Sequence, residues 1–313
     1  MLKDILPDFL NKSISFLKFD DLCELRLRLS MPITVNYKNT YYFLGANGVC
    51  NENDAIICTN EILKYIISKA SNYSVYAVND ELKEGFLSVG DGIRIGITGT
   101  VVMQEDKILT VKNISSLNIR IPHQIVGSSY KISKLIFDDA GQVLSTLIIG
   151  SPGVGKTTIL RDLCVQINKV RRDINILLLD ERLEISSSVN GVPSLNVGTS
   201  TDIICGGKKD FNITNGIRSM SPNVVIVDEI GSTNDIKAIE YAMNSGVSII
   251  ASVHSKDIFE FQKKYEFENL IKSRAFKRFA VISGINGKGT IDNVYDEFLR
   301  PILRYIWLKL FYL

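Results

Sequence analysis

Paired cysteines are absent from this sequence of 313 residues. The chain has five cysteines, an odd number, and no two of them form a C-x-x-C pair. This scatter argues against a disulfide framework and against a zinc site, and it favours reduced thiols in a reducing compartment. The five are Cys23, Cys50, Cys58, Cys164 and Cys205.

A large excess of charge of one sign is also absent. The formal net charge is +2, which gives no overall reason to expect binding to nucleic acid, although it leaves a local basic patch open. Apolar residues make up 45% of the chain and charged residues 22%, which is the balance of a globular protein. We therefore expect no nucleic-acid partner.

Long apolar runs are missing as well. The apolar runs are interrupted before they reach the length of a membrane span, and the N-terminus lacks the continuous apolar stretch of a signal peptide. The sequence also has no internal repeat and no low-complexity segment. We therefore expect a globular protein that stays in the cytoplasm.

The first part of the chain, residues 1–125, predicts a small α+β domain. Residues 33–37 and 41–44 read as the two strands of a hairpin. Apolar residues at helical spacing predict a helix over 60–70, with Asn60 at its cap. Further strands are predicted at 85–89, 93–97, 100–103 and 117–121, the last of which ends at Pro122.

The pattern changes after a boundary region at 122–141. Buried apolar strands then alternate with amphipathic helices, of which 159–167 and 236–243 are two. This alternation predicts a parallel sheet that is covered by helices on both faces. We place a second domain at 126–298, with strands predicted at 143–149, 176–179, 224–227, 247–253 and 279–283.

Residues 150–158 match the phosphate-binding pattern G-x-x-x-x-G-K-[ST] and lie between a predicted strand and a predicted helix. The glycines let the backbone N–H groups point at phosphate oxygens, and the helix N-terminus adds a partial positive charge. Lys156 would reach the β- and γ-phosphates, and the Thr157 hydroxyl would hold Mg²⁺. The pattern predicts an ATP site made of Gly150, Ser151, Pro152, Gly153, Val154, Gly155, Lys156, Thr157 and Thr158.

The predicted strand 224–227 ends in two carboxylates, Asp228 and Glu229. The carboxyl ends of parallel strands form the edge where α/β sheets keep their ligands. Asp228 would bind Mg²⁺ through its waters, and Glu229 would polarise the attacking water. Such a pair can also be ordinary surface charge, but together with the P-loop it predicts an ATPase.

Two further strand ends carry polar side chains. His254 ends the strand 247–253, where a neutral imidazole could sense the γ-phosphate or could be a hydrogen-bonded structural residue. The strand 176–179 is followed by carboxylates that could position metal or water, with Glu181 as the candidate metal ligand, or that could form a solvated surface cluster. That charged cluster consists of Asp180, Glu181, Arg182 and Glu184.

These motifs, in this order, extend over most of residues 20–285. The chain resembles the stage III sporulation protein AA family, which is related to the secretion ATPases of type II and type IV systems. The narrowest signal is Arg-Ser-Met-Ser-Pro at 218–222, followed by Val-Asp-Glu-Ile-Gly at 227–231. Further matching segments are 24–28 with Pro32, 90–99, 114–120, 180–184, 191–193 and 197–198.

The resemblance implies a fold class, an assembly and a location. The implied fold class is α/β, a P-loop NTPase domain with a RecA-like, mostly parallel sheet, preceded by a smaller α+β domain. The implied assembly is a hexameric ring on the mother-cell face of the channel between mother cell and forespore, with membrane proteins of that channel as partners. Arginines of the N-terminal domain, Arg94 and Arg120, would complete the nucleotide site, and Arg218 is a further candidate.

The sequence departs from the family pattern at two positions. Ser200 and Ser232 stand where such proteins usually carry arginine. The loss of two cations near the site bears on the rate of hydrolysis rather than on nucleotide binding. It leaves open a nucleotide-gated scaffold with little turnover. A nucleic-acid-dependent P-loop motor is a third reading, which the near-neutral charge disfavours.

The C-terminal segment, residues 299–313, has an unusual composition. It is mostly apolar, yet it is too short and too charged to span a bilayer. Its cations do not share one helical face, so its amphipathic pattern is poor. We expect this tail to pack against its own domain, and contact with a membrane-embedded partner is the alternative.

Overall fold

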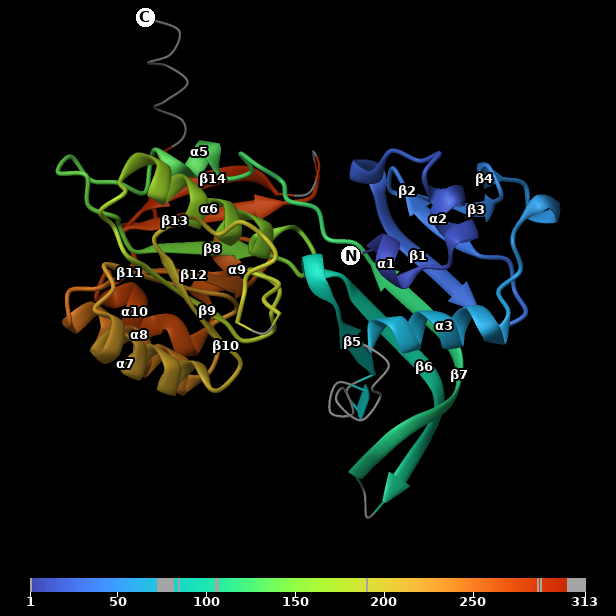
Figure 1. The fold of residues 1–313 in the computed structure, drawn as a ribbon. Helices are drawn as coiled ribbons and strands as arrows, with labels where there is room; N and C mark the ends of the chain where they lie inside the picture. Colours follow the sequence, from blue (N-terminus) through green and yellow to red (C-terminus); the bar gives the residue numbers. More distant parts are fainter. Residues whose placement is uncertain are drawn as a thin grey trace, which may run out of the picture. The chain divides into compact units, whose positions relative to one another are not determined.

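The chain folds into two compact units, Met1–His123 and Gln124–Leu313, in the computed structural model (Figure 1). The structure describes residues 2–71, 82–83, 85–104, 107–189, 191–285, 287 and 289–302. Each unit has its own sheet and its own core, so each is described by itself.

The first unit is built on an antiparallel sheet in the order β4-β3-β2-β1-β7-β6-β5. Short helices α1 (Leu2–Ile5) and α2 (Asp8–Ile14) and the longer α3 (Asn60–Ala70) pack with the sheet around a single apolar core. The strands are β1 Leu22–Arg28, β2 Thr34–Tyr37, β3 Thr40–Gly45, β4 Gly48–Cys50, β5 Phe86–Ser88, β6 Arg94–Gln104 and β7 Lys107–Arg120.

The hairpin predicted in this unit is present. β2 and β3 pair antiparallel, and both turn residues, Lys38 and Asn39, have positive φ values of 53° and 62°. Two central residues in this conformation match the twist of the flanking strands. The predicted helix is also present as α3, but Thr59 rather than Asn60 is its N-cap residue.

The strands that follow are longer than predicted. The segments expected at 93–97 and 100–103 form one strand, β6, because an irregularity between Thr98 and Thr100 lets the pairing with β7 continue. Gly99 lies at this irregularity, where an added Cβ would come within 2.6 Å of the Lys112 carbonyl oxygen. β7 likewise runs for 14 residues instead of the five expected at 117–121.

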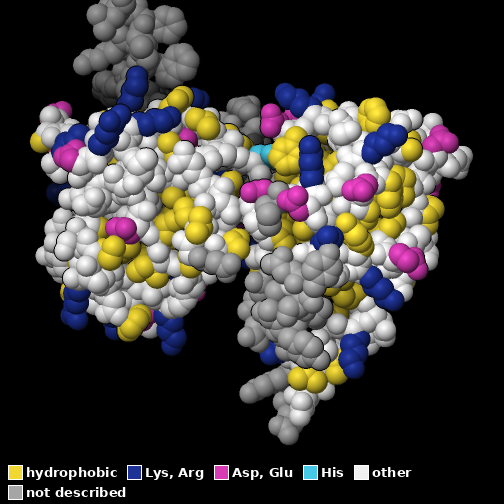
Figure 2. All heavy atoms as spheres, in the orientation of Figure 1, with side chains coloured by type: hydrophobic (Ala, Val, Ile, Leu, Met, Phe, Trp, Pro, Cys, Tyr) yellow, Lys and Arg dark blue, Asp and Glu magenta, His cyan; other side chains and the backbone are white. Residues whose placement is uncertain are grey.

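Apolar side chains are exposed on both units, interspersed with charged ones (Figure 2). In the first unit, the outer parts of β6 and β7 pair only with each other among the described strands, and they carry exposed Val101, Met103 and Ile108. No helix within the described ranges combines the length and the apolar composition that crossing a bilayer requires.

The second unit is built on a sheet in the order β10-β9-β11-β12-β8-β13-β14, in which only β14 is antiparallel to its neighbour. This arrangement confirms the α/β prediction with a mostly parallel sheet. β10 and β14 were not predicted, because β10 is only half-buried and β14 mixes apolar with charged residues. The strands are β8 Thr146–Gly150, β9 Ile176–Asp180, β10 Thr201–Cys205, β11 Val224–Val227, β12 Ser248–His254, β13 Arg278–Ser283 and β14 Thr290–Asp296.

Helices cover both faces of this sheet (Figure 1). α6 (Lys156–Val170) packs on one face through Ile159, Leu160 and Leu163. α7 (Lys209–Met220) and α8 (Thr233–Asn244) pack on the other face, where α9 (Ile258–Gln262) and α10 (Glu268–Lys272) join the same core. The short α5 (Tyr130–Ser133) contacts α6.

The tight approach of α6 to the segment before β10 gives a test of this packing. Gly198 has φ +90°, and an added Cβ would meet Asn168 Oδ1 at 2.3 Å and the Cys164 carbonyl oxygen at 2.9 Å. Gly191 has a similar φ of +80°, but nothing lies within 4 Å of its added Cβ. Substitution of Gly191 therefore introduces backbone strain alone, whereas substitution of Gly198 introduces backbone strain and steric overlap.

We expect Gly191→Ala to lower the free energy of unfolding by about 1–2 kcal/mol, the cost of a side chain in the left-handed region. Gly198→Ala should lower it by about 1–3 kcal/mol more, because the methyl group also overpacks the α6 contact. Urea denaturation of both variants measures the difference. Equal losses of unfolding free energy in the two variants would show that the close contact at Gly198 does not contribute to the cost of the substitution.

Candidate nucleotide-binding site

A pocket of about 410 Å³ lies at the carboxyl ends of the parallel strands of the second unit. It combines the P-loop, the end of β9, the start of α7 and the ends of β11 and β12. Its lining residues are Pro152, Gly153, Gly155, Lys156, Thr157, Thr158, Asp180, Glu181, Arg182, Glu184, Lys209, Asp228, Glu229 and His254.

The P-loop has the geometry that its sequence predicts. Gly153 and Gly155 have φ values of 75° and 105°, in the left-handed region that favours glycine, and α6 begins directly after Gly155. Gly150 is required for a different reason, because an added Cβ would lie 2.7 Å from Ile282 Cγ1 and 2.8 Å from Val154 Cγ2. Glycine is therefore favoured at positions 153 and 155 by the backbone conformation and at position 150 by the lack of space for a side chain.

Lys156 is buried at the start of α6, with 6% of its surface exposed. Its Nζ donates to the carbonyl oxygens of Gly150 and Ser151 at 2.9 and 3.0 Å and to His254 Nδ1 at 2.8 Å. Burial lowers the pKa of the Lys156 ammonium, although the carboxylates of Asp228 and Glu229 act in the opposite direction. The charge that would meet phosphate is thus held inside the loop.

His254 connects Lys156 to Glu229. An ammonium group has only donors, so His254 Nδ1 must accept the hydrogen bond from Lys156, and the ring proton must then be on Nε2. Nε2 lies 3.0 Å from Glu229 Oε1. The imidazole predicted to lie near the γ-phosphate therefore contacts both the P-loop lysine and the candidate base.

Asp228 is tied to the first turn of α6. The Thr157 hydroxyl donates to Asp228 Oδ2 at 2.7 Å, which brings together the two groups predicted to hold Mg²⁺. The Ser252 hydroxyl of the neighbouring strand β12 donates to Asp228 Oδ1 and accepts from the backbone N–H of Glu229 at 2.9 Å. Sequence reasoning assigned no role to Ser252, because a serine inside an apolar strand gives no signal of its own.

Glu229 is held by contacts to its backbone and its carboxylate. Its φ of 53° is uncommon for a residue other than glycine, and such strain is found at sites where the surroundings fix the conformation. Lys209 Nζ donates to the Glu229 carbonyl oxygen at 2.7 Å, and Arg182 pairs with Glu229 Oε2 at 3.0 Å. Lys209, at the start of α7, is a second residue that sequence reasoning did not identify.

The acidic cluster after β9 divides into different roles. Asp180 is 2% exposed and accepts four hydrogen bonds from its own loop, from the backbone N–H groups of Glu184, Ile185 and Ser186 and from the Ser186 hydroxyl. The Asp180 carboxylate therefore stabilises the loop, and Asp180 is not part of a solvated surface cluster, which was the alternative prediction. Glu181 lines the pocket, and its carboxylate pairs with Lys209 at 3.0 Å.

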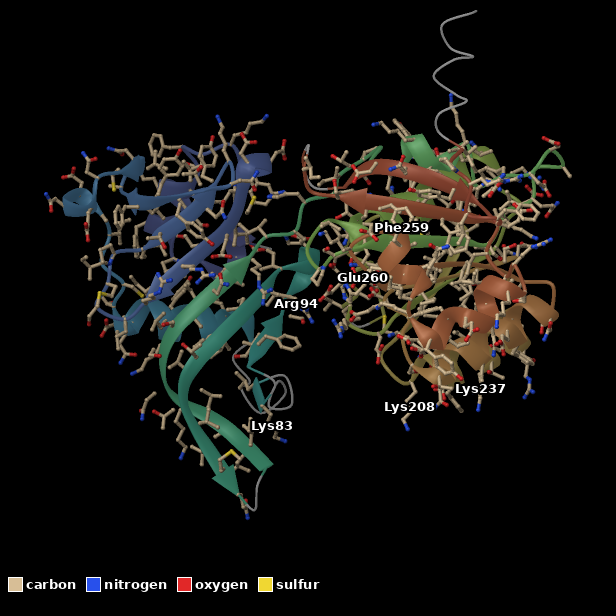
Figure 3. All side chains as sticks on the ribbon, turned by 180° about the vertical axis from the view of Figure 1, so that it is seen from behind. Lys83, Arg94, Lys208, Lys237, Phe259 and Glu260 are labelled. Carbon is tan, nitrogen blue, oxygen red and sulfur yellow. The ribbon has the colours of Figure 1, made fainter. Side chains whose placement is uncertain are left out.

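The three candidate arginines do not line this pocket. Arg218 lies in the last turn of α7, where its Nε donates to the Tyr241 hydroxyl at 3.3 Å. Arg94, which is labelled in Figure 3, and Arg120 belong to the first unit and are directly paired neighbours on β6 and β7. The guanidinium carbon of Arg94 lies 4.6 Å from the centre of the Phe86 ring.

Ser232 and Ser200, at the two positions where the family resemblance led us to expect arginine, have local structural contacts. Ser232 is the N-cap of α8, where its hydroxyl accepts from the Asp235 N–H while the Asp235 carboxylate accepts from the Ser232 N–H. This reciprocal pair satisfies two of the free donors at a helix start. The Ser200 hydroxyl donates to the Arg172 carbonyl oxygen at 3.2 Å.

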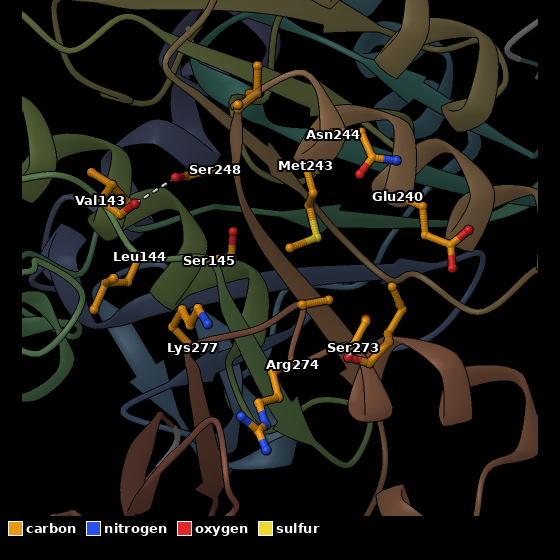
Figure 4. Close-up of a pocket in the computed structure, with 14 residues that line it drawn as sticks. Val143, Leu144, Ser145, Glu240, Met243, Asn244, Ser248, Ser273, Arg274 and Lys277 are labelled. Carbon is orange, nitrogen blue, oxygen red and sulfur yellow. Dashed lines mark hydrogen bonds between the residues drawn. The ribbon is translucent and has the colours of Figure 1, made fainter.

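A larger cavity, of about 600 Å³, lies at the opposite edge of the same sheet, where β8, β12 and β13 begin (Figure 4). Ser248 donates to the Val143 carbonyl oxygen across its wall, and Glu240 of α8 lines it. No glycine-rich turn or helix start faces this cavity among its lining residues, so size alone does not make it the nucleotide site.

No group of three or more histidine, cysteine, aspartate or glutamate residues is arranged to hold a metal ion by itself in the described part of the chain. A cation at Thr157 and Asp228 would therefore need further oxygen ligands from phosphate or water, which is the usual arrangement for Mg²⁺.

The second unit combines a mostly parallel sheet with a P-loop at the carboxyl ends of its strands, and the chain shares its fold with solved structures of an ATPase and of a pilus motor. Solved structures with the same fold include the ATPase DotB of Legionella pneumophila, with a TM-score of 0.57 and 15% identity over 88% of this chain and 76% of that one. The pilus retraction motor PilT with bound ADP has a TM-score of 0.56 and 11% identity over 88% and 76%. At these identities, the likeness concerns the fold.

The family follows from the sequence comparison. The chain belongs to the family described as sporulation stage III, protein AA, whose family model matches residues 3–300. It is 32% identical over 302 residues to the stage III sporulation protein AA of Bacillus subtilis (strain 168), which covers 95% of this chain and 94% of that protein. The resemblance seen in the sequence motifs is confirmed.

The bridge that Ser252 forms between the Asp228 carboxylate and the Glu229 backbone N–H can be tested by removing its hydroxyl. Ser252→Ala leaves the partly buried N–H of Glu229 without its acceptor and Asp228 without one of its donors, so we expect the free energy of unfolding to fall by about 1–3 kcal/mol. The control is Ser255→Ala on the same chain segment, whose hydroxyl donates only to the Asp257 carbonyl oxygen. That variant should lose about 0.5–1.5 kcal/mol. Urea denaturation distinguishes them, and a smaller loss for Ser252→Ala would contradict the bridging role.

Proposed function

We propose that this protein binds ATP with Mg²⁺ and hydrolyses it, as a ring-forming ATPase of sporulation. The observation that carries the proposal is the connection of Lys156 through His254 to Glu229, beside the Thr157–Asp228 contact in the same pocket. Groups for phosphate binding, metal binding and water activation thus meet at one edge of the sheet.

The residues present fit a nucleoside triphosphate. An added Cβ at Gly153 would meet nothing within 4 Å, so the loop is open there, close to the backbone N–H groups at the start of α6 that would meet phosphate. Thr157 and Asp228 would hold Mg²⁺, with Glu181 as a further candidate ligand. When bound, Mg²⁺ neutralises phosphate charge. Lys156 would exchange its hydrogen bonds to loop carbonyls for bonds to phosphate oxygens.

Glu229 is the proposed base that activates water. Its two carboxylate oxygens pair with His254 and Arg182, and each oxygen keeps a second lone pair that can accept from a water molecule. Arg182 is two-thirds exposed, and an exposed ion pair is weak. His254 is the proposed sensor of the γ-phosphate. A shift of Lys156 toward the phosphate would break the hydrogen bond that its Nζ donates to His254 Nδ1.

The assembly and location are proposed on the basis of the family. A hexameric ring would let Arg94, Arg120 or Arg218 complete a nucleotide site, since none of them lines the pocket of its own second unit. We place this ring in the cytoplasm of the mother cell, held at the membrane by proteins of the sporulation channel. A nucleic-acid partner is not expected, and stimulation of turnover by single-stranded DNA would favour the alternative of a nucleic-acid-dependent motor.

A nucleotide-gated scaffold with little turnover is the second candidate. It is favoured by the engagement of both oxygens of Glu229 and by the serines at 200 and 232. Scaffold and motor share nucleotide binding and differ in hydrolysis, so turnover and oligomer size have to be measured on the same sample with ATP and with ADP. A scaffold changes its size between the two nucleotides while releasing almost no phosphate.

The proposed roles of Lys156 and Glu229 predict different kinetic defects. Glu229→Gln should keep ATP binding and slow phosphate release by about 10²–10⁴-fold, the contribution of a general base. Lys156→Ala should weaken ATP binding itself, because the buried ammonium is lost. Titration with a fluorescent ATP analogue measures binding, and a phosphate-release assay measures turnover.

Glu240→Gln is the matched control for the base, because it makes the same chemical change at the 600 Å³ cavity on the other edge of the sheet. It should leave both binding and turnover unchanged. Undiminished turnover in Glu229→Gln would remove this residue from the base role, and unchanged ATP binding in Lys156→Ala would place the nucleotide elsewhere.

A site shared between subunits predicts recovery of activity in mixed rings. Arg94→Ala/Arg120→Ala and Glu229→Gln should each be nearly inactive alone. When the two proteins are mixed, subunits that retain Glu229 meet subunits that retain the arginines, so part of the turnover should return. Phosphate release at several mixing ratios tests this. A mixture no more active than its components means that the arginines do not act on a neighbouring subunit.

A further inference from the structure

An exposed apolar groove lies between α9 and β14, and none of its lining residues lines the candidate nucleotide pocket. The groove has a volume of about 470 Å³. Its lining includes Phe259 of α9, Tyr295 and Asn293 of β14, and Phe298 and Pro301 of the segment after β14. Phe259 is 69% exposed and projects from α9 next to Glu260 (Figure 3), and Phe298 is 49% exposed.

The chain after β14 runs along this groove. Tyr295 forms an antiparallel bridge with Pro301, the Asp296 N–H donates to the Arg300 carbonyl oxygen at 2.9 Å, and the Ile302 N–H donates to the Val294 carbonyl oxygen at 2.7 Å. These bonds set the direction of the backbone at Ile302. A continuation in that direction passes Asn293, which is itself a lining residue.

We propose that this groove binds residues 303–313 of its own chain. These residues lie outside the described part of the structure, and nine of the eleven are apolar or aromatic. Eleven residues reach about 36 Å when extended and about 16 Å as a helix, so either form can cover the groove from Ile302. The proposal is independent of nucleotide binding and goes beyond the proposed function.

The charges of the two partners are complementary. Residues 303–313 contain Arg304 and Lys309 and no acidic residue. The segments that border the groove, 257–262 and 292–297, contain five carboxylates and no lysine or arginine. Two of the five, Asp296 and Glu297, already pair with Arg300 and Arg278, and the other three are Asp257, Glu260 and Asp292. Glu260 and Asp292 accept hydrogen bonds from neutral donors, the Lys256 N–H and the Ser283 hydroxyl, so these bonds do not neutralise their charge.

The short connection favours the chain's own segment over that of a second copy. Pro301 lines the groove, and residue 303 follows two positions later. Segments joined this closely have effective concentrations on the order of millimolar. A segment from another molecule competes only at a comparable concentration of protein.

The single tryptophan of the chain, Trp307, lies in this segment and reports on it directly. In the full-length protein, we expect Trp307 to emit at a shorter wavelength than in the guanidinium-denatured chain and to be protected from acrylamide quenching. Both properties should persist across a wide dilution series and should not change when phosphatidylcholine or phosphatidylglycerol vesicles are added.

Phe259→Asp places a charge in the groove at an exposed position, so the fold should persist while the emission of Trp307 shifts toward that of the denatured chain. Phe259→Leu keeps the groove apolar and should resemble the unmodified protein. Phe211→Asp on α7 is the matched control, because Phe211 is similarly exposed at 66% and does not line the groove. Circular dichroism checks that each variant is folded.

Four results would overturn the proposal. Emission of the unmodified protein at the wavelength of the denatured chain means that the segment does not bind the groove. A short-wavelength emission that is lost on dilution assigns the groove to a second copy. A short-wavelength emission that appears only with vesicles assigns the segment to a membrane. An equal shift in Phe259→Asp and Phe211→Asp likewise contradicts docking at this site.

Discussion

The position of β12 between β8 and β11 is the constraint on which the candidate site depends. Parallel pairing in this order places the end of β12 between the P-loop and the acidic pair, so His254 lies within hydrogen-bond distance of Lys156 on one side and within contact of Glu229 on the other. The same strand places Ser252 against the Asp228 carboxylate and the Glu229 backbone N–H. A direct pairing of β8 with β11 would leave no position from which these residues could connect the two motifs.

Buried polar groups around the pocket are stabilised by partners from their own unit. The guanidinium of Arg161 on α6 donates to the carbonyl oxygens of Glu184 and Ile185, while Asp180 accepts the N–H groups of the same loop. Burial lowers the pKa of Arg161, and the charge of Asp180 acts against that effect. The loop after β9 has no backbone hydrogen bonds of a strand or helix, so Arg161 and Asp180 supply its donors and acceptors. These bonds fix the wall of the pocket that this loop forms.

Much of the fold could be predicted from the sequence, because its strongest signals are local. The apolar strands of the second unit and the turn at Lys38 and Asn39 follow from periodicity and turn chemistry. β14 could not be found in this way, because its partly exposed edge position shows no continuous apolar run. For the site, the motif residues were identified from spacing. Ser252 and Lys209 depend on contacts across strands and helices, and an isolated sequence carries no signal for these.

The N-cap at Ser232 limits which residues can replace this serine. A serine at this position closes the start of α8 with Asp235, and an arginine could not accept the same hydrogen bond. An arginine at position 232 would add a cation close to the acidic motif, but it would weaken the helix start by about 1 kcal/mol. One residue thus determines both the charge beside the acidic motif and the stability of the helix start. A relative with arginine at this position would therefore be expected to cap the helix with another residue nearby.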